Sequence, residues 1–380
     1  MALANAPDAT RGAHAPPAPA AVEPGAVPAL FARQRRRLAL ASVLLVLMLL
    51  ALAVVSLGTG AVAIPPGRVV AVIRGWFAQD PAVLASREAL VVFGIRLPRL
   101  VLGALIGAGL AVSGALMQGL FRNPLADPGL VGVSSGSALA AATTIVLADR
   151  ILGTSQFQLP FVLLPAGAFL GGLASTLILY AIATREGRTS IAIMLLAGVA
   201  LGAFAGALTG VLSFISDDRQ LRDLTFWALG SLSGASWTKV MAVAPLILPV
   251  LIAVPMLARG LNALLLGEAE AFHLGIPVQR LKNTAIVMVA VAVGASVAAA
   301  GVIGFVGIVV PHLLRLMFGP DHRMLLPFSA LAGATLLTGA DLITRILVAP
   351  AELPIGILTA AIGAPFFLWL LLRRDRSLDA

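Results

Sequence analysis

Two lysines are the candidates for a nucleotide-phosphate site of the usual loop type, in which a lysine directly follows a glycine. Lys239 follows Thr238 and Lys282 follows Leu281, so the GxxxxGK[ST] pattern is absent. The sequence therefore predicts that the chain does not hydrolyse nucleotide itself and is not an enzyme.

Acidic side chains inside apolar segments could carry protons or sodium ions through a gradient-driven transporter. Asp341 is the only acid within the predicted membrane spans, and Arg345 follows four residues later on the same helix face. We interpret the two residues as a structural ion pair. The spans also lack the paired carboxylates or histidine clusters of a membrane-embedded enzyme, so energy is expected to come from a separate protein.

Three arginines lie at the predicted outer face: Arg96 and Arg99 in the RLPR segment, and Arg345 near the outer end of a later span. Positive charge is disfavoured on this side of a membrane protein, so it needs a reason. One explanation is contact with lipid phosphates. The other is a docking site for an acidic partner, in which each guanidinium group receives a carboxylate.

The composition predicts the elements that must position these groups. Of 380 residues, 59% are hydrophobic and 11% are charged, which identifies a polytopic membrane protein. Its apolar runs have the length of helices and lack the alternation of barrel strands, so the fold class is all-α. The net charge of +9 lies mostly at span ends, which favours contact with the lipid bilayer and not with nucleic acid. The absence of cysteine excludes disulfides and Cys-ligated metal.

About ten transmembrane helices are predicted, within a membrane domain at residues 38–373. The Ala- and Pro-rich segment 1–37 is predicted to be a disordered tail, and the arginines of the loops place both termini in the cytoplasm. Pro311 is expected to break the eighth span, near GFVGIVVPH. The predicted spans are 38–58, 97–118, 130–148, 160–183, 190–214, 240–258, 284–306, 308–318, 325–347 and 355–372.

A polar interruption at residues 259–282, which we call the knob, separates two of these spans. Gly267 and the turn at residues 275–277 are expected to divide the knob into two short helices. Its leucines have the i, i+3, i+4 spacing of one helix face, and its charged side chains are left for water. Such a segment is either a docking surface for another protein or a plain surface loop.

Glycines at every fourth position line one face of the predicted span 190–214; they are Gly198, Gly202, Gly206 and Gly210. This stripe allows the close approach of another backbone, in plain helix packing, or of a bulky ligand that moves along the helix. The same spacing at Gly103 and Gly107, and at Gly167 and Gly171, is interpreted as packing only.

Several long motifs, in a fixed order, resemble the FecCD-type permeases, which are membrane subunits of ATP-driven importers for iron complexes, heme and cobalamin. The resemblance runs from about residue 94 to the C-terminus and implies the type II ABC importer permease fold. It rests on RLPR (96–99), GALMQGLFRNPLADPGLVGVSSG (114–136), LNALLLGEAEAFHLGIPV (261–278), GFVGIVVPHLLRLMFGPDHR (304–323) and ELPIGILTAAIGAPFFLWLL (352–371).

The resemblance implies that two copies of the chain assemble in the bacterial inner membrane with two ABC ATPases, which bind ATP and magnesium, and with a periplasmic substrate-binding protein. That protein would dock at Arg96, Arg99 and Arg345, and the fifth spans would flank a central path. The knob would couple to the ATPases, and two loops would narrow a cytoplasmic gate. The matching residues are Leu261, Leu264, Leu265, Gly267, Glu268, Glu270, Phe272 and Gly275 for coupling, and Asn123, Leu125, Thr189 and Ser190 for the gate.

The segment 217–237 is most similar to that of hemin permeases. Arg219 and Arg222 could attract propionates and Trp227 could stack on a porphyrin, although a short amphipathic helix over the path is the alternative. Heme is therefore the expected cargo, with a ferric siderophore or cobalamin as alternatives. No histidine is placed to ligate heme iron in the path, and no cofactor or metal is expected on the chain itself.

Overall fold

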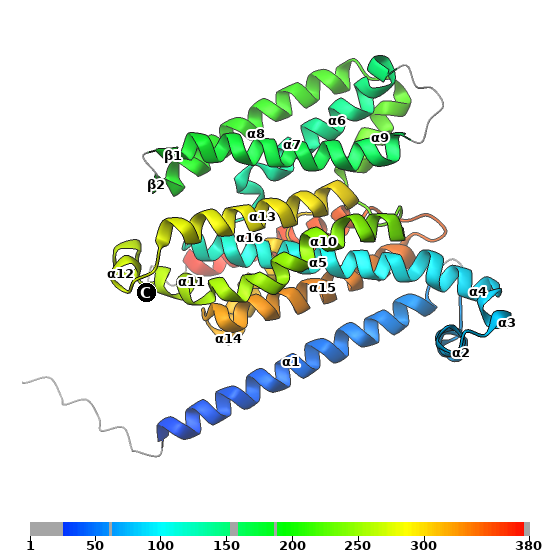
Figure 1. Ribbon diagram of the computed structural model, residues 1–380, viewed down its shortest axis with the longest axis horizontal. Coiled ribbons are helices and arrows are strands. Elements are labelled where there is room, and N and C mark those ends of the chain that lie inside the picture. The colour runs from blue at the N-terminus through cyan, green and yellow to red at the C-terminus, as the bar shows by residue number, and fades with distance from the viewer. Residues whose placement is uncertain (1–25, 61–62, 153–158, 186–187, 376–380) are drawn as a thin grey trace, which may run out of the picture. The chain divides into compact units, whose positions relative to one another are not determined.

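The computed structural model describes residues 26–60, 63–152, 159–185 and 188–375, and it consists of helices and one short hairpin (Figure 1). The chain divides into two compact units, Met1–Val43 and Leu44–Ala380, and helix α1 (Ala26–Gly58) contributes to both. The predicted all-α fold class is confirmed. Residues 1–25 of the predicted tail lie outside the described residues, and α1 begins at Ala26, within the segment 1–37 that was predicted as tail.

The remaining elements follow in chain order. The first half contains α2 (Pro66–Phe77), α3 (Pro81–Leu84), α4 (Arg87–Ala89), the π-helix η1 (Leu90–Arg96), α5 (Leu97–Leu120), the 3-10 helix η2 (Pro128–Val131), α6 (Val133–Leu152), α7 (Leu159–Ala183), β1 (Thr184–Arg185), β2 (Arg188–Thr189) and α8 (Ile191–Phe214). The second half contains α9 (Asp218–Ala228), α10 (Trp237–Ala253), the 3-10 helix η3 (Val254–Leu257), α11 (Ala258–Leu264), α12 (Glu268–His273), α13 (Val278–Ala300), α14 (Val306–Phe318), α15 (His322–Leu347) and α16 (Ile355–Asp375).

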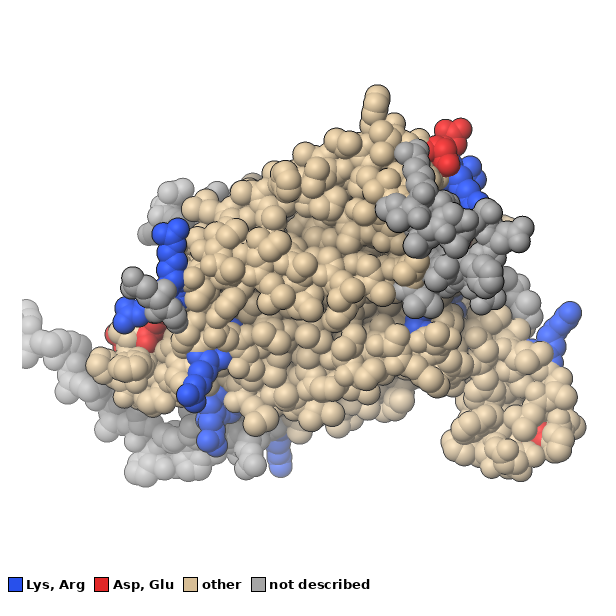
Figure 2. Space-filling model, turned by 45° about the horizontal axis from the view of Figure 1, so that its top comes forward, with Lys and Arg blue, Asp and Glu red and all other residues tan. Residues whose placement is uncertain are grey.

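The predicted spans correspond to helices of the described chain. Seven segments are long and apolar enough to cross a membrane, and three shorter apolar helices, at residues 133–147, 306–318 and 355–369, match the other predicted spans. Figure 2 shows a broad face of the molecule without charged side chains, and Lys and Arg lie toward its ends. A face of this kind suits lipid contact.

Helix α5 is the centre of the larger unit, where it packs against α10, α13, α14 and α15 (Figure 1). Small residues permit this close packing. A Cβ at Gly107 would collide with the carbonyl group of Gly333, and a Cβ at Gly114 would collide with that of Gly307. The packing interpretation of Gly107 is therefore confirmed. It is also confirmed for Gly171, where a Cβ would collide with the side chain of Ala140 on α6.

The interruption near the eighth span lies before Pro311 and not at it. Helix α13 ends at Ala300 and is followed by Gly301, whose φ is 72°, and α14 starts after Phe305, whose φ is 68°. Pro311 is inside α14. The prediction of a break in this segment is confirmed, but its attribution to the proline is wrong, because the chain turns at left-handed residues instead.

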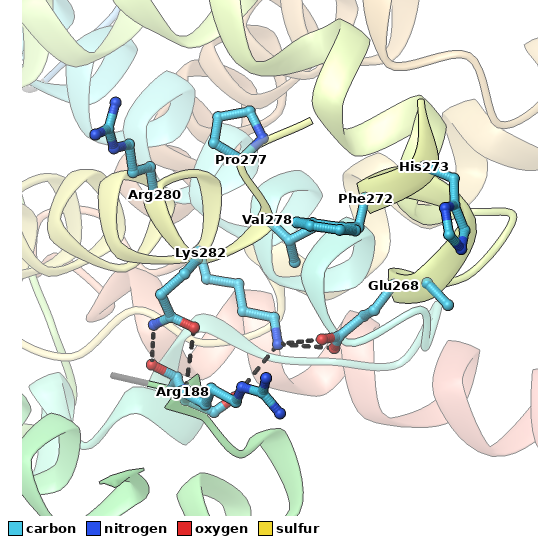
Figure 3. A pocket seen from close by; sticks show the side chains of 11 residues that line it. Arg188, Glu268, Phe272, His273, Pro277, Val278, Arg280 and Lys282 are labelled. Carbon is cyan, nitrogen blue, oxygen red and sulfur yellow. Dashed lines mark hydrogen bonds and ion pairs between the residues drawn. The ribbon is translucent and has the colours of Figure 1, made fainter. Parts of the chain in front are cut away.

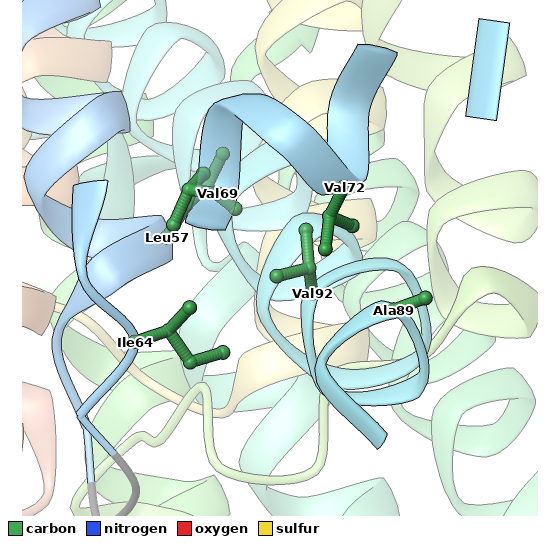
Figure 4. Close-up of a cluster of buried hydrophobic side chains, with 6 residues drawn as sticks. All are labelled: Leu57, Ile64, Val69, Val72, Ala89 and Val92. Atoms are coloured by element: carbon green, nitrogen blue, oxygen red, sulfur yellow. The ribbon is translucent and has the colours of Figure 1, made fainter. Parts of the chain in front are cut away.

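A small hydrophobic cluster joins the end of α1 to the short helices that follow it (Figure 4). Leu57 and Ile64 pack with two valines of α2, Val69 and Val72, and with Val92 of η1. This cluster fixes the start of α5, and with it the RLPR segment, against the end of α1. These short helices were not predicted from the sequence.

Candidate functional site

The knob has the predicted two-helix form, with α11 before Gly267 and α12 after it. Gly267 has a φ of 128°, and a Cβ there would collide with the carboxylate of Glu270. Gly275 has a φ of 80° and begins the turn into α13. Both positions require glycine because side-chain-bearing residues rarely adopt these angles. The predicted division of the knob is confirmed.

The apolar side chains that the knob exposes are not all those expected from the leucine spacing. Leu261 and Leu264 are 0% and 1% exposed, because they anchor α11 in the protein's own core. They therefore offer no surface to another protein, and their predicted role in coupling stays a prediction. Glu268 and Glu270 are exposed, as predicted. The exposed apolar side chains of the knob are Leu265, Leu266, Phe272 and Leu274.

Leu266 and Leu274 were missed because their spacing does not match the helix face of the other leucines. The signal that could have found them is their position beside a glycine. Leu266 precedes Gly267 and Leu274 precedes Gly275, where the chain leaves the helix and turns side chains outward.

The predicted gate residues lie in two turns. Asn123 shapes the turn after α5, where its Oδ1 atom accepts a hydrogen bond from the Leu125 amide at 3.0 Å. Ser190 caps α8, since its side chain accepts from the Ile193 amide. Thr189 ends β2 and is buried. Among the described residues, no hydrogen bond joins Asn123 or Leu125 to Thr189 or Ser190.

A polar network connects Thr189 with the knob, and dashed lines in Figure 3 mark its bonds around Lys282. The Gln279 side chain accepts from the Thr189 amide at 3.1 Å and donates to the Thr189 hydroxyl group. Lys282 donates to the Thr189 carbonyl oxygen at 3.3 Å and forms an ion pair with Glu268 at 2.7 Å. These side chains border a cavity of about 790 Å³ between β2, α12 and the start of α13.

The three arginines of the predicted docking site are buried, with exposed fractions of 5% for Arg96, 7% for Arg99 and 9% for Arg345. Arg96 donates to the Leu57 carbonyl oxygen at 2.6 Å. Arg345 also donates to groups at the end of α1. The chain itself satisfies these guanidinium groups, so a lipid or a partner protein can reach them only by displacing internal contacts, and their docking role stays a prediction.

Two carboxylates pair with Arg99 and Arg345 in this arginine cluster. Asp341 pairs with Arg345 at 3.1 Å, which confirms the predicted structural ion pair, and also with Arg99 at 2.8 Å. Glu352 pairs with Arg99 at 2.9 Å. The Glu352 side chain is 39% exposed, whereas that of Arg99 is 8% exposed. Glu352 therefore covers Arg99 on its solvent side.

The four glycines of the α8 stripe have different surroundings. A Cβ at Gly198 would collide with the Leu130 carbonyl oxygen of η2, so this glycine serves packing. At Gly202, Gly206 and Gly210 a Cβ would meet no other described group within 4 Å. Helix α8 therefore presents an open glycine face, and most of its large apolar side chains are exposed as well.

The segment after α8 folds into the short helix α9, which begins with a capping box formed by Asp217 and Gln220. Arg219 and Arg222 are exposed on it. Trp227 is half-buried and packs against an alanine cluster that includes Ala141. The short amphipathic helix considered from the sequence is thus present, and its tryptophan makes contacts within the chain.

Comparisons with known proteins agree with this architecture. A model of the FecCD transport family matches residues 47–373. The hemin transport system permease protein of Yersinia pestis is 50% identical over 74% of this chain and 82% of its own length. The cobalamin import system permease protein of Halobacterium salinarum is 46% identical over 76% of this chain and 75% of its own length. The vitamin B12 import system permease protein of Vibrio cholerae is 44% identical over 77% of this chain and 86% of its own length.

Among solved structures, an inward-facing metal-chelate type ABC transporter matches 87% of this chain and 97% of its own, with a TM-score of 0.73 and 34% identity. The fold and these relatives define a multi-pass membrane permease, which is a transport component. The chain belongs to the FecCD transport family, and it is a permease of an ABC importer.

Proposed function

We propose that this permease carries heme from a periplasmic binding protein to the cytoplasm, driven by two ABC ATPases that bind ATP and magnesium. The observation that carries the proposal is the 50% identity with a hemin permease. Exposed Arg219 and Arg222 on α9 are suited to heme propionates. Cobalamin is the second candidate, since two cobalamin permeases are 46% and 44% identical.

We propose that the permease is a homodimer in the bacterial inner membrane, with its termini and its knob in the cytoplasm. This arrangement gives a role to two exposed surfaces, the glycine face of α8 and the knob. The glycine face of α8 would flank the path in each copy, because smooth walls without ligating groups suit the passage of a large flat molecule. The exposed side chains of the knob, Phe272 foremost, would contact the ATPase. Asn123, Leu125, Thr189 and Ser190 would narrow the inner end of the path.

The cargo can be tested in vesicles that contain the permease and its ATPase, supplied with paired binding proteins for heme, cobalamin or a ferric siderophore. We expect ATP-dependent accumulation of heme only. Accumulation of cobalamin or siderophore without heme would overturn the assignment of cargo, while leaving the importer class intact.

We propose that the binding protein docks when one of its carboxylates replaces Glu352 as the ion-pair partner of Arg99. Because Glu352 covers this buried guanidinium group, an incoming carboxylate can pair with Arg99 only where Glu352 moves away. Glu352 is the more exposed partner, so it exchanges at lower cost than Asp341. Arg96 and Arg345 would hold the end of α1 during this exchange.

The Glu352→Gln variant is expected to bind the binding protein more tightly, by about threefold, because the internal competitor loses its charge. Affinity can be measured by surface plasmon resonance on nanodiscs. The matched control is Glu88→Gln, which removes a carboxylate from the exposed Arg68 pair. Unchanged or weaker binding by Glu352→Gln would refute the exchange.

A further inference from the structure

The polar network at Thr189 connects two parts of the protein that the chain otherwise separates. One part is α12 in the exposed knob, and the other is the start of α8, with its open glycine face. Between them lies the cavity of about 790 Å³, which Figure 3 shows bordered by α12 and by the strand that carries Arg188. Side chains that border this cavity connect α12 with the strand end that precedes α8.

We propose that Lys282 and Gln279 are positioning residues that transmit movement of α12 to the start of α8, an inference that rests on the proposed function. Lys282 is 5% exposed, and its ammonium group bonds at once to the Glu268 carboxylate at 2.7 Å and to the Thr189 carbonyl oxygen at 3.3 Å. A buried ammonium group of this kind resists separation from its partners.

Gln279 fastens Thr189 to the start of α13. Its amide group both accepts from the backbone of Thr189 and donates to its hydroxyl group, and its nitrogen also donates to Asn283 Oδ1 at 2.8 Å. Thr189 thus has its amide, carbonyl and hydroxyl groups all bound to side chains of α13. Since Ser190 then caps α8, displacement of Thr189 displaces the first turn of that helix.

Lys282 lies between the exposed helix α12 and the buried end of β2, where it contacts both. Glu268 is the first residue of α12, and its side chain is 44% exposed, whereas that of Lys282 is 6% exposed, so the ion pair joins an exposed helix to a buried group. The ion pair therefore transmits force from an exposed helix to a buried strand end. Chains of packed and hydrogen-bonded groups that can adopt two arrangements are one way in which coupling between sites is carried.

The test is transport per ATP in vesicles that contain the full assembly. Lys282→Met keeps the length of the side chain and removes its charge, and we expect transport per ATP to fall about 10-fold while ATPase binding is retained. Lys282→Arg should preserve most of the coupling because it can reach both partners. Arg280→Met is the matched control, since Arg280 is exposed on the same turn and borders the same cavity.

If Lys282→Met does not fold, Gln279→Leu provides the second variant, with the same expected loss. Unchanged transport per ATP in the folded variant, or an equal loss in Arg280→Met, would overturn the proposal. Failure of the proposed function is distinguishable, because the unmodified assembly would then show no ATP-driven uptake at all.

Discussion

Replacing Phe272 with Asp is expected to abolish ATP-driven uptake by separating the permease from its ATPase. Phe272 is 71% exposed at the end of α12, although it is a large aromatic residue on a polar segment. Burial of such a side chain in an interface contributes about 3 kcal/mol, and a buried carboxylate adds a desolvation cost. We therefore expect ATPase affinity to fall about 100-fold or more.

Affinity can be measured by co-purification and by titration of the ATPase against permease in nanodiscs. Phe77→Asp is the matched control, because Phe77 is 75% exposed on α2 at the opposite end of the helices. It should fold and bind the ATPase normally. Retained ATPase binding by Phe272→Asp would remove the knob from the proposed interface.

Replacing Gly206 with Leu is expected to block transport in a protein that still folds and still binds its ATPase. The leucine side chain fits within one copy of the chain, because a Cβ at Gly206 meets no other described group within 4 Å. It would instead occupy the space beside α8 where the cargo is proposed to pass. Uptake and thermal unfolding should be measured on the same preparation.

Gly107→Leu is the contrasting variant, since a Cβ at Gly107 collides with the Gly333 carbonyl group. It should fail to fold, and so shows what loss of packing looks like in the same assays. Dissociation of two permease copies by Gly206→Leu, with stability of each copy retained, would favour plain helix packing for the stripe. Normal uptake by Gly206→Leu would exclude both a role of Gly206 in the transport path and a role in helix packing.

Local patterns in the sequence were sufficient to predict the membrane helices and the shape of the knob. Apolar runs fix the helices because lipid leaves the backbone no other hydrogen-bond partners. Gly267 and Gly275 mark the ends of α12 because their backbone angles exclude other residues. Asp341 and Arg345 pair as expected because four residues form nearly one helical turn.

Contacts between distant segments were beyond prediction. Arg99 and Glu352 are far apart in the chain, and nothing in either local sequence indicates that one covers the other. The same is true of Thr189 and Lys282. Leu261 has the amphipathic spacing of a docking helix, but helix periodicity does not distinguish a face that contacts a partner from one that contacts the protein's own core.

The central claim is that this permease is driven by a separate ATPase and has no energy source of its own. It is tested most directly by heme accumulation in sealed vesicles, with the binding protein and ATP present, and with or without the ATPase. The account predicts accumulation against the gradient only when the ATPase is present. Accumulation by the permease without it, abolished by an uncoupler, would contradict the account.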